Sequence, residues 1–121
     1  MLLENNYYRI IERNTEAGEF AVQILPECEV FQGHFPGHPV CPGVCNMEMV
    51  KECAMQLVGK SLTIATVKQC RFLNVITPEG SPQLKIKVSA TPLEGEDAYL
   101  VQASIEDETT IYLTFKGNMK S

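Results

Sequence analysis

The sequence has no long apolar run, because its longest uninterrupted apolar stretch is the four residues 98–101. A helix that crosses a bilayer needs about 20 mostly apolar residues, so we expect no membrane-spanning helix. A secretory signal begins with basic residues followed by an apolar core, and residues 1–6 lack that pattern. Both absences favour a cytoplasmic protein.

Basic patches are also missing from the sequence. The chain carries 10 Lys and Arg against 15 Asp and Glu, a net charge of −5, and the charges are dispersed. A nucleic-acid-binding protein normally has a basic patch or stripe. We therefore expect no nucleic-acid partner, and the net charge also disfavours an acidic partner unless a local basic region receives it.

The five cysteines include no Cys-x-x-Cys pair. An odd number of cysteines without an export signal argues against a disulfide framework. We expect all five to act as small apolar packing residues. They are Cys28, Cys41, Cys45, Cys53 and Cys70.

The length and composition are typical of one globular domain, here residues 1–121. Hydrophobic residues make up 45% of the chain and charged residues 21%. A chain of this length buries roughly two-thirds of its unfolded surface, so it needs neither metal nor disulfides to stabilise a core.

Residues 43–58 predict a buried helix. Pro42 suits a first helical turn, and Gly59 suits the position after the last turn. The segment is apolar almost all round, which is typical of a helix at the centre of a fold. Its narrow polar stripe consists of Glu48, Glu52 and Gln56, with Asn46 and Lys51 beside them.

The rest of the chain predicts strands separated by turns. Apolar and polar residues alternate cleanly over 84–90, which indicates a strand with one wet face. Residues 32–43 hold three glycines and three prolines and are expected to be irregular. One helix and five or six antiparallel strands make an α+β fold, in which a curved sheet wraps the apolar helix. The strand-like segments are 7–12, 19–25, 63–72, 84–90, 99–105 and 109–115.

Residues 31–48 are the most informative for chemistry. His34 lies on a loop whose glycines allow close approach of a ligand and whose prolines fix its path. Gly43 and Val44 begin the predicted helix, where free N–H groups and the positive end of the helix dipole can hold a carbonyl oxygen that gains negative charge. Glu48 follows in the second turn of that helix.

Taken alone, these residues leave three interpretations open. In the first interpretation, the loop is a plain connection, and Glu48 belongs to a solvated helix stripe. A second interpretation is a zinc site, although prolines punctuate its candidate ligands and no Cys-x2-Cys pair is present. In the third, His34, a residue type that titrates near neutral pH, forms an acid–base pair with Glu48. The zinc candidates are His34, His38, Cys41 and Cys45.

The run Gly-His-Phe-Pro-Gly-x-Pro-Val-x-Pro-Gly-Val at 33–44, followed by Glu48, resembles the signature of β-hydroxyacyl-acyl-carrier-protein dehydratases of fatty acid synthesis. These enzymes have the hot-dog fold, an antiparallel sheet wrapped around one long helix. Residues 67–80 are similar to the strand and turn of that family, although the turn 78–80 reorders its usual Pro-Gly-acidic sequence. The predicted order of elements fits the same family over nearly the whole chain.

The resemblance implies a role for each residue of the site. His34 is the general base that takes the α-proton of a β-hydroxyacyl thioester, and the N–H of Gly43 holds the thioester oxygen. Glu48, from the neighbouring subunit, helps to protonate and expel the hydroxyl as water, which leaves a trans-2-enoyl thioester. The chemistry needs no cofactor and no metal. Further residues expected to lie beside the oxyanion and the substrate are Phe35, Pro42 and Val44.

The resemblance also implies partners. One is an acyl carrier protein that bears the acyl-phosphopantetheine substrate, and the others are copies of the chain, in a homodimer or trimer of dimers that shares a continuous sheet. The carrier is acidic in this family, so this acidic chain needs a local basic patch to receive it. The candidates for that patch are Lys60, Lys68 and Arg71.

Three positions near the expected site depart from the family pattern. Cys41 stands where methionine is usual, and Cys45 and Asn46 stand where larger, mostly apolar residues are common. These departures keep two alternatives in view: a non-catalytic acyl-carrier-binding hot-dog subunit and a hot-dog acyl thioesterase.

Overall fold

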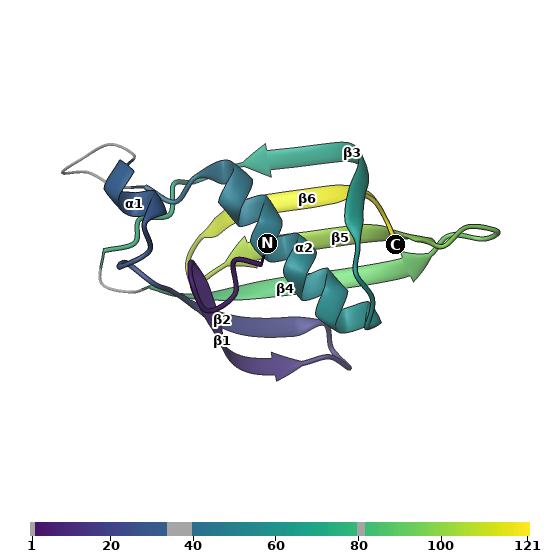
Figure 1. Ribbon diagram of the computed structural model, residues 1–121, viewed down its shortest axis with the longest axis horizontal. Coiled ribbons are helices and arrows are strands. Elements are labelled where there is room, and N and C mark those ends of the chain that lie inside the picture. Colours follow the sequence, from purple (N-terminus) through teal and green to yellow (C-terminus); the bar gives the residue numbers. More distant parts are fainter. Residues whose placement is uncertain (1, 34–39, 80–81) are drawn as a thin grey trace.

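The computed structural model describes residues 2–33, 40–79 and 82–121. Six antiparallel strands form one sheet in the order β1-β2-β4-β5-β6-β3, and the long helix α2 lies across one face of it (Figure 1). The strands are β1 (Tyr8–Asn14), β2 (Glu19–Ile24), β3 (Thr63–Phe72), β4 (Gln83–Pro92), β5 (Ala98–Glu106) and β6 (Ile111–Lys120), and the helices are α1 (Val30–Gly33) and α2 (Gly43–Val58).

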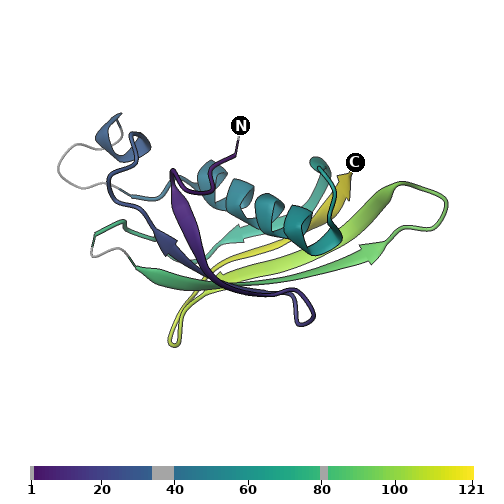
Figure 2. The ribbon, with the colours of Figure 1, turned by 60° about the horizontal axis from the view of Figure 1, so that its bottom comes forward.

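The sheet curves around α2 (Figure 2), as the pattern of apolar residues predicted. In β4, Leu84, Ile86 and Val88 are buried on the helix side, while Lys85 and Lys87 face solvent. Neither the sheet face nor the helix is able to bury its apolar surface alone. This arrangement is the hot-dog fold, and it confirms the predicted α+β class.

Packing against the sheet stabilises α2. Its side chains Met49, Val50, Cys53 and Ala54 are buried in the core. Full burial of an apolar side chain of valine or methionine size contributes about 1.5–3 kcal/mol. A 16-residue helix is marginal by itself, so this buried face, and not intrinsic propensity, keeps it helical.

Both ends of α2 lie where the sequence predicted them. Pro42 is the residue before the first turn, with φ −62° and ψ 140°, and proline has no N–H to satisfy there. Gly59 follows the last turn with φ 73°, a left-handed conformation that glycine adopts without steric cost, and its N–H donates to the carbonyl oxygen of Met55 at 2.8 Å.

Several predicted strand ends lie one or two residues from the observed ones, and two further predictions were wrong. Residues 32 and 33, expected to be irregular, belong to the one-turn helix α1, which is too short to leave a periodic pattern in the sequence. Strand β6 continues to Lys120, beyond the predicted end at 115, although Gly117 and Asn118 are poor strand formers. A Cβ at Gly117 would lie 2.3 Å from the backbone oxygen of Thr66, so glycine is what allows β3 to pack this closely.

All five cysteines are free thiols, as expected for packing residues. Cys41 and Cys53 are buried, and the other three are half-buried. No helix within the described ranges is long and apolar enough to cross a membrane.

Candidate active site

The first residue of α2 packs against the last residue of β3. A Cβ at Gly43 would lie 2.8 Å from Cε1 and 3.0 Å from Cζ of Phe72. With any larger residue at position 43, the Phe72 ring would have to move. The predicted oxyanion-binding residue Gly43 is therefore held at the end of the edge strand β3, in contact with an aromatic ring that is 55% exposed.

Two backbone donors at the start of α2 have no acceptor among the described residues. The N–H groups of Cys45 and Asn46 donate to the carbonyl oxygen of Pro42 at 3.0 and 3.1 Å. No hydrogen bond joins the N–H of Gly43 or Val44 to another described residue, and no side chain caps the helix. The first turn also carries no acidic residue. Such donors, at the positive end of the helix dipole, are suited to an oxygen that gains negative charge.

Of the other residues predicted around the oxyanion, the structure describes Val44 and Pro42 only. The side chain of Val44 is 74% exposed, and Pro42 is half-buried. His34 and Phe35 lie outside the described residues, as does the zinc candidate His38, so their positions stay predictions. Within the described parts of the chain, no group of three or more His, Cys, Asp or Glu side chains is arranged to hold a metal ion.

A buried polar cluster lies against the first turn of α2, and the sequence analysis did not predict it. The hydroxyl of Tyr7 donates to Oδ1 of Asn46 at 2.8 Å, and the Tyr7 ring stacks on Phe31 with centroids 5.4 Å apart. Burial is the largest cause that raises the pKa of Tyr7, and the nearby Cys41 raises it further. Burial also raises the pKa of the Cys41 thiol to about 11. Both groups are therefore uncharged near pH 7. The one sequence signal for this cluster is Asn46, a polar residue where the family has apolar ones.

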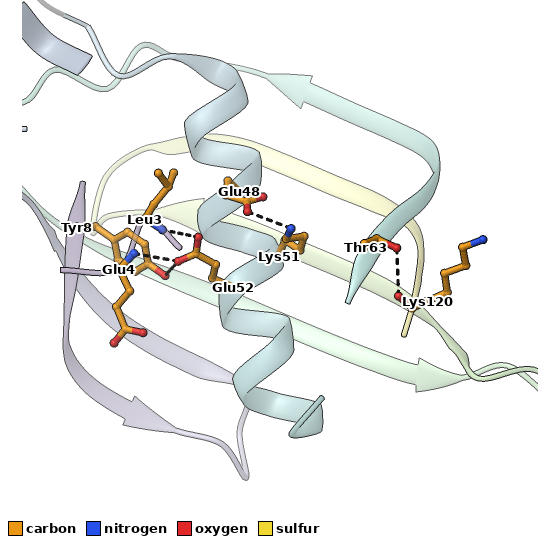
Figure 3. A network of polar contacts seen from close by, with 8 residues as sticks. All are labelled: Leu3, Glu4, Tyr8, Glu48, Lys51, Glu52, Thr63 and Lys120. Carbon is orange, nitrogen blue, oxygen red and sulfur yellow. Dashed lines mark hydrogen bonds and ion pairs between the residues drawn. The ribbon is translucent and has the colours of Figure 1, made fainter. Parts of the chain in front are cut away.

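Glu48 lies beside Lys51 and not beside Gly43. Its Oε1 is 3.0 Å from Nζ of Lys51, and the Glu48 side chain is 26% exposed (Figure 3). Glu48 comes five positions after Gly43, which places it about 7.5 Å along the axis and about 140° around it. Relative to Val44, four residues before it, Glu48 lies about 6 Å along the axis and only about 40° around it, so it is on nearly the same side of α2 as that residue.

Glu52 contradicts the expectation of a solvated polar stripe. Only 3% of this residue is exposed, and its carboxylate accepts three hydrogen bonds (Figure 3). The donors are the N–H of Leu3 at 2.7 Å, the N–H of Glu4 at 3.0 Å and the hydroxyl of Tyr8 at 2.9 Å. The amide of Gln56 also donates to Oε1 of Glu4 at 3.0 Å. The stripe therefore holds the N-terminal segment against α2.

An open pocket of about 620 Å³ lies next to the start of α2, between the N-terminal segment, α1 and the first helical turn. Its volume is within the range of small-molecule sites, about 300–1,000 Å³. The pocket has acidic and amide groups as well as apolar walls. The apolar lining residues are Leu3, Tyr7, Leu25, Cys28, Val30 and Cys45.

The three predicted docking cations differ in their surroundings. Nζ of Lys60 lies 3.0 Å from Oδ1 of Asp97 and 5.8 Å from the centre of the Tyr99 ring, so its charge is already engaged. Lys68 and Arg71 are exposed on β3 and form no ion pair with another described residue. Lys60 is therefore the one of the three that forms an ion pair with another described residue.

Comparison with known proteins establishes the family. A family model described as "ApeI-like: ApeI dehydratase" matches residues 11–112. The chain belongs to the ApeI-like dehydratase family. The 3-hydroxyacyl-acyl-carrier-protein dehydratase FabZ of Latilactobacillus sakei is 33% identical to this ApeI-like chain over 113 residues, which cover 83% of the chain and 79% of the relative. The chain aligns with a smaller share of other FabZ relatives: 62% of the protein from Fusobacterium nucleatum and 38% of the protein from Levilactobacillus brevis.

Two solved structures share the fold of this ApeI-like protein. The dehydratase heterocomplex ApeI:P from Xenorhabdus doucetiae superimposes with a TM-score of 0.69 at 21% identity, covering 93% of this chain and 96% of that chain. The HP0420 homologue from Helicobacter felis gives a TM-score of 0.69 at 11% identity, covering 96% of this chain and 88% of that chain. These likenesses confirm the hot-dog fold, and the family model confirms the resemblance seen in the motif at 33–44.

Proposed function

We propose that this protein dehydrates a β-hydroxyacyl thioester carried by an acyl carrier protein, releasing a trans-2-enoyl thioester and water. The observation that carries the proposal is the start of α2, where the N–H groups of Gly43 and Val44 donate to no other described residue at the end of the dehydratase-like motif. Preorganised donors of this kind stabilise charge that exists only in the transition state. The family and the FabZ names of several relatives support the same reaction class.

In the proposed mechanism, His34 takes the α-proton of the substrate. The electron pair left on the α-carbon moves toward the thioester carbonyl, whose oxygen is held by the N–H of Gly43. The C–O bond at the β-carbon then breaks, and Glu48 supplies the proton with which the hydroxyl leaves as water. A general base of this kind contributes about 10²–10⁴-fold to the rate.

Glu48 is proposed to act across a chain boundary. In its own chain its carboxylate is paired with Lys51 at 3.0 Å, and it lies about 6–7.5 Å along the helix axis from Val44 and Gly43. A second hot-dog chain would bring a carboxylate to the site from outside. The open edge strand β3, which ends at the Phe72–Gly43 contact, is the proposed place of pairing.

The substrate carrier is the second proposed partner. Names of relatives such as the FabZ of Latilactobacillus sakei include the acyl carrier protein, which supports a carrier-bound substrate here. The cations left available for an acidic carrier are Lys68 and Arg71, since Lys60 is paired with Asp97. The pocket of about 620 Å³ beside the first turn of α2 offers space for part of an acyl chain.

One observation favours a second candidate function, a non-catalytic subunit that binds acyl carriers. The carboxylate of Glu48 is paired with Lys51 at 3.0 Å, and a catalytic role requires that pair to open. Such a subunit would bind the acyl carrier tightly without changing the acyl group.

The experiment compares the rate of enoyl thioester formation, followed by its absorbance, between wild type and two histidine variants. We expect His34→Ala to lower turnover by about 10²–10⁴-fold. The matched control His38→Ala changes a neighbouring loop histidine with no assigned role and should keep wild-type turnover. Equal turnover in wild type and His34→Ala would refute the assignment, and binding of the acyl carrier without any product would favour the non-catalytic subunit.

A further inference from the structure

The buried hydroxyl of Tyr7 reaches the first turn of α2. Tyr7 is 0% exposed, and its hydroxyl donates to Oδ1 of Asn46 at 2.8 Å. Asn46 is itself only 5% exposed. A buried tyrosine hydroxyl normally has a partner, because leaving it unpaired is costly. This bond therefore joins the N-terminal segment to one position at the start of α2.

The Tyr7 hydroxyl keeps its proton near pH 7 and remains a donor. Burial and then the nearby Cys41 raise the pKa of Tyr7, and burial raises the pKa of the Cys41 thiol to about 11. Cys41 immediately precedes Pro42, whose carbonyl oxygen accepts from the N–H of Asn46 at 3.1 Å. The hydroxyl therefore lies where the chain enters α2, close to both a thiol and an amide of that turn.

Asn46 lies close to the backbone donors of the proposed oxyanion site. It comes three positions after Gly43 and two after Val44, which places it about 4.5 Å and about 3 Å from them along the helix axis. The N–H groups of Asn46 and Cys45 both donate to the carbonyl oxygen of Pro42, and these two bonds close the first turn. A shift of Asn46 would therefore displace the whole turn, and the two donors with it.

The ring and the backbone of Tyr7 hold the other element, α1. The ring stacks on Phe31 of α1, with centroids 5.4 Å apart and planes 28° apart. In the backbone, the N–H of Leu25 donates to the carbonyl oxygen of Tyr7 at 2.9 Å. The carbonyl oxygen of Leu25 accepts from the N–H of Cys28 at 3.2 Å, and that of Cys28 accepts from the N–H of Phe31 at 3.1 Å. Helix α1 is the element directly before His34 in the sequence.

We propose that Tyr7 is a positioning residue, which fixes the start of α2 against α1 and so places the donors of Gly43 and Val44 relative to the loop that carries His34. Its ring holds one element and its hydroxyl holds the other. A misplacement of about 1 Å in a catalytic site can cost about 10²-fold in rate. The inference rests on the proposed function for the reaction that the positioning serves.

Tyr8 supplies a matched control on the same helix. It is also 0% exposed, and its hydroxyl donates to Oε1 of Glu52 at 2.9 Å (Figure 3). Glu52 comes nine positions after Gly43, which is about 13.5 Å along the helix axis. Tyr8→Phe therefore removes a buried hydroxyl far from the proposed donors, whereas Tyr7→Phe removes one beside them. Both variants keep the ring.

Steady-state kinetics of enoyl thioester formation test the positioning role. Tyr7→Phe and Tyr8→Phe should both lower the urea midpoint of unfolding, since each loses a buried hydrogen bond. Only Tyr7→Phe should lower kcat, by about tenfold, and its KM should change less than about twofold, because the geometry of the reacting groups changes and the substrate contacts remain. Asn46→Leu should act like Tyr7→Phe, and the double variant should be no slower than either, because all three lose the same bond.

Amide NMR spectra test the same contacts without any substrate. The signals of Gly43 and Val44 should shift in Tyr7→Phe and in Asn46→Leu, because the first turn of α2 moves. The same signals should stay in place in Tyr8→Phe, whose lost hydrogen bond lies about two turns further along the helix.

Two kinetic results would overturn the inference. One is equal kcat in wild type and Tyr7→Phe, and the other is an equal loss of kcat in Tyr8→Phe, which general destabilisation would produce. If wild type forms no enoyl thioester, the proposed function fails, and the amide spectra decide on Tyr7: unmoved signals of Gly43 and Val44 in Tyr7→Phe would overturn the inference. If Tyr7→Phe does not fold, Asn46→Leu is compared with Tyr8→Phe in the same two measurements.

Discussion

Removing the carboxylate of Glu52 should release the N-terminal segment from α2 and destabilise the whole fold. The carboxylate is 3% exposed and accepts hydrogen bonds from the N–H groups of Leu3 and Glu4 and from the hydroxyl of Tyr8. In Glu52→Ala the two backbone donors are able to turn to water, but the Tyr8 hydroxyl stays in the core without its acceptor, because Tyr8 is 0% exposed.

The expected loss of unfolding free energy follows from these three bonds. A hydrogen bond to a charged group contributes about 1.5–3 kcal/mol, and a buried donor left unpaired costs about 1–3 kcal/mol. With the two backbone donors re-solvated, we expect Glu52→Ala to lose about 3–5 kcal/mol, a large share of the usual 5–15 kcal/mol for a domain. The nearly isosteric Glu52→Gln keeps one acceptor oxygen and should lose less than Glu52→Ala.

Urea unfolding measures the loss, and amide hydrogen exchange locates it. Exchange at Leu3 and Glu4 should accelerate in Glu52→Ala, because their N–H groups lose their acceptor. The control is Glu48→Ala on the same helix, which removes a partly exposed ion pair and should cost at most about 0.5–1 kcal/mol. A loss below about 1 kcal/mol in Glu52→Ala, or an equal loss in the control, would refute the reasoning.

Three further predictions concern the sheet, a thiol and acid stability. Gly117→Ala should destabilise by about 3 kcal/mol or more in urea unfolding, because its Cβ would overlap the β3 backbone, whereas Gly95→Ala, with open space but φ 78°, should cost about 1 kcal/mol. Burial raises the pKa of Cys53 to about 12, so iodoacetamide at pH 8 should label this thiol only after the protein unfolds; labelling of the native protein at the rate of a free thiol would contradict this. The hydroxyl of Tyr112 is the largest cause that lowers the pKa of Asp107, so the stabilisation by this carboxyl is present above its ordinary pKa of 3.8 and is lost as pH falls through its lower pKa in the folded protein. The urea midpoint of Asp107→Asn should therefore fall less steeply on acidification than that of wild type, and identical slopes would contradict the assignment.

The elements with local sequence signals were predicted closely. Helix 43–58 has Pro42 before it and Gly59 after it, and the structure places the helix between these two residues. The β-rich segment 63–72 is β3 with the same bounds. Proline, glycine and the spacing of apolar residues determine local backbone structure, so these signals predict an element from the sequence before any tertiary contact is known.

The wrong predictions depend on contacts between distant parts of the chain. Glu52 has the spacing of a solvated stripe, but its hydrogen-bond donors lie 44 to 49 residues away in the sequence. The ion pair of Lys60, a docking candidate, with Asp97, 37 residues away, was likewise not visible in the sequence, and the docking role itself stays a prediction. Gly117 reads as a strand breaker until the close packing of β3 against β6 is known. At each of these positions, the environment of the side chain depends on a tertiary contact that the local sequence pattern does not show.

The candidate site was predicted in part. The sequence motif located the start of α2, and the structure adds the Phe72 ring and the N–H groups of Gly43 and Val44, which have no acceptor in the described part of the chain. The Tyr7–Asn46 hydrogen bond was not predicted, because it joins residues 39 positions apart. The roles of His34 and Glu48 stay predictions that rest on the resemblance.

The most direct test of the central claim is the identity of the product. The wild-type protein is incubated with a β-hydroxyacyl-acyl-carrier-protein, and the acyl group is analysed by mass spectrometry. The account predicts an acyl carrier whose thioester is intact and whose acyl group is lighter by one water, with a conjugated double bond. An unchanged acyl group, or a free acid with release of the carrier thiol, would contradict it.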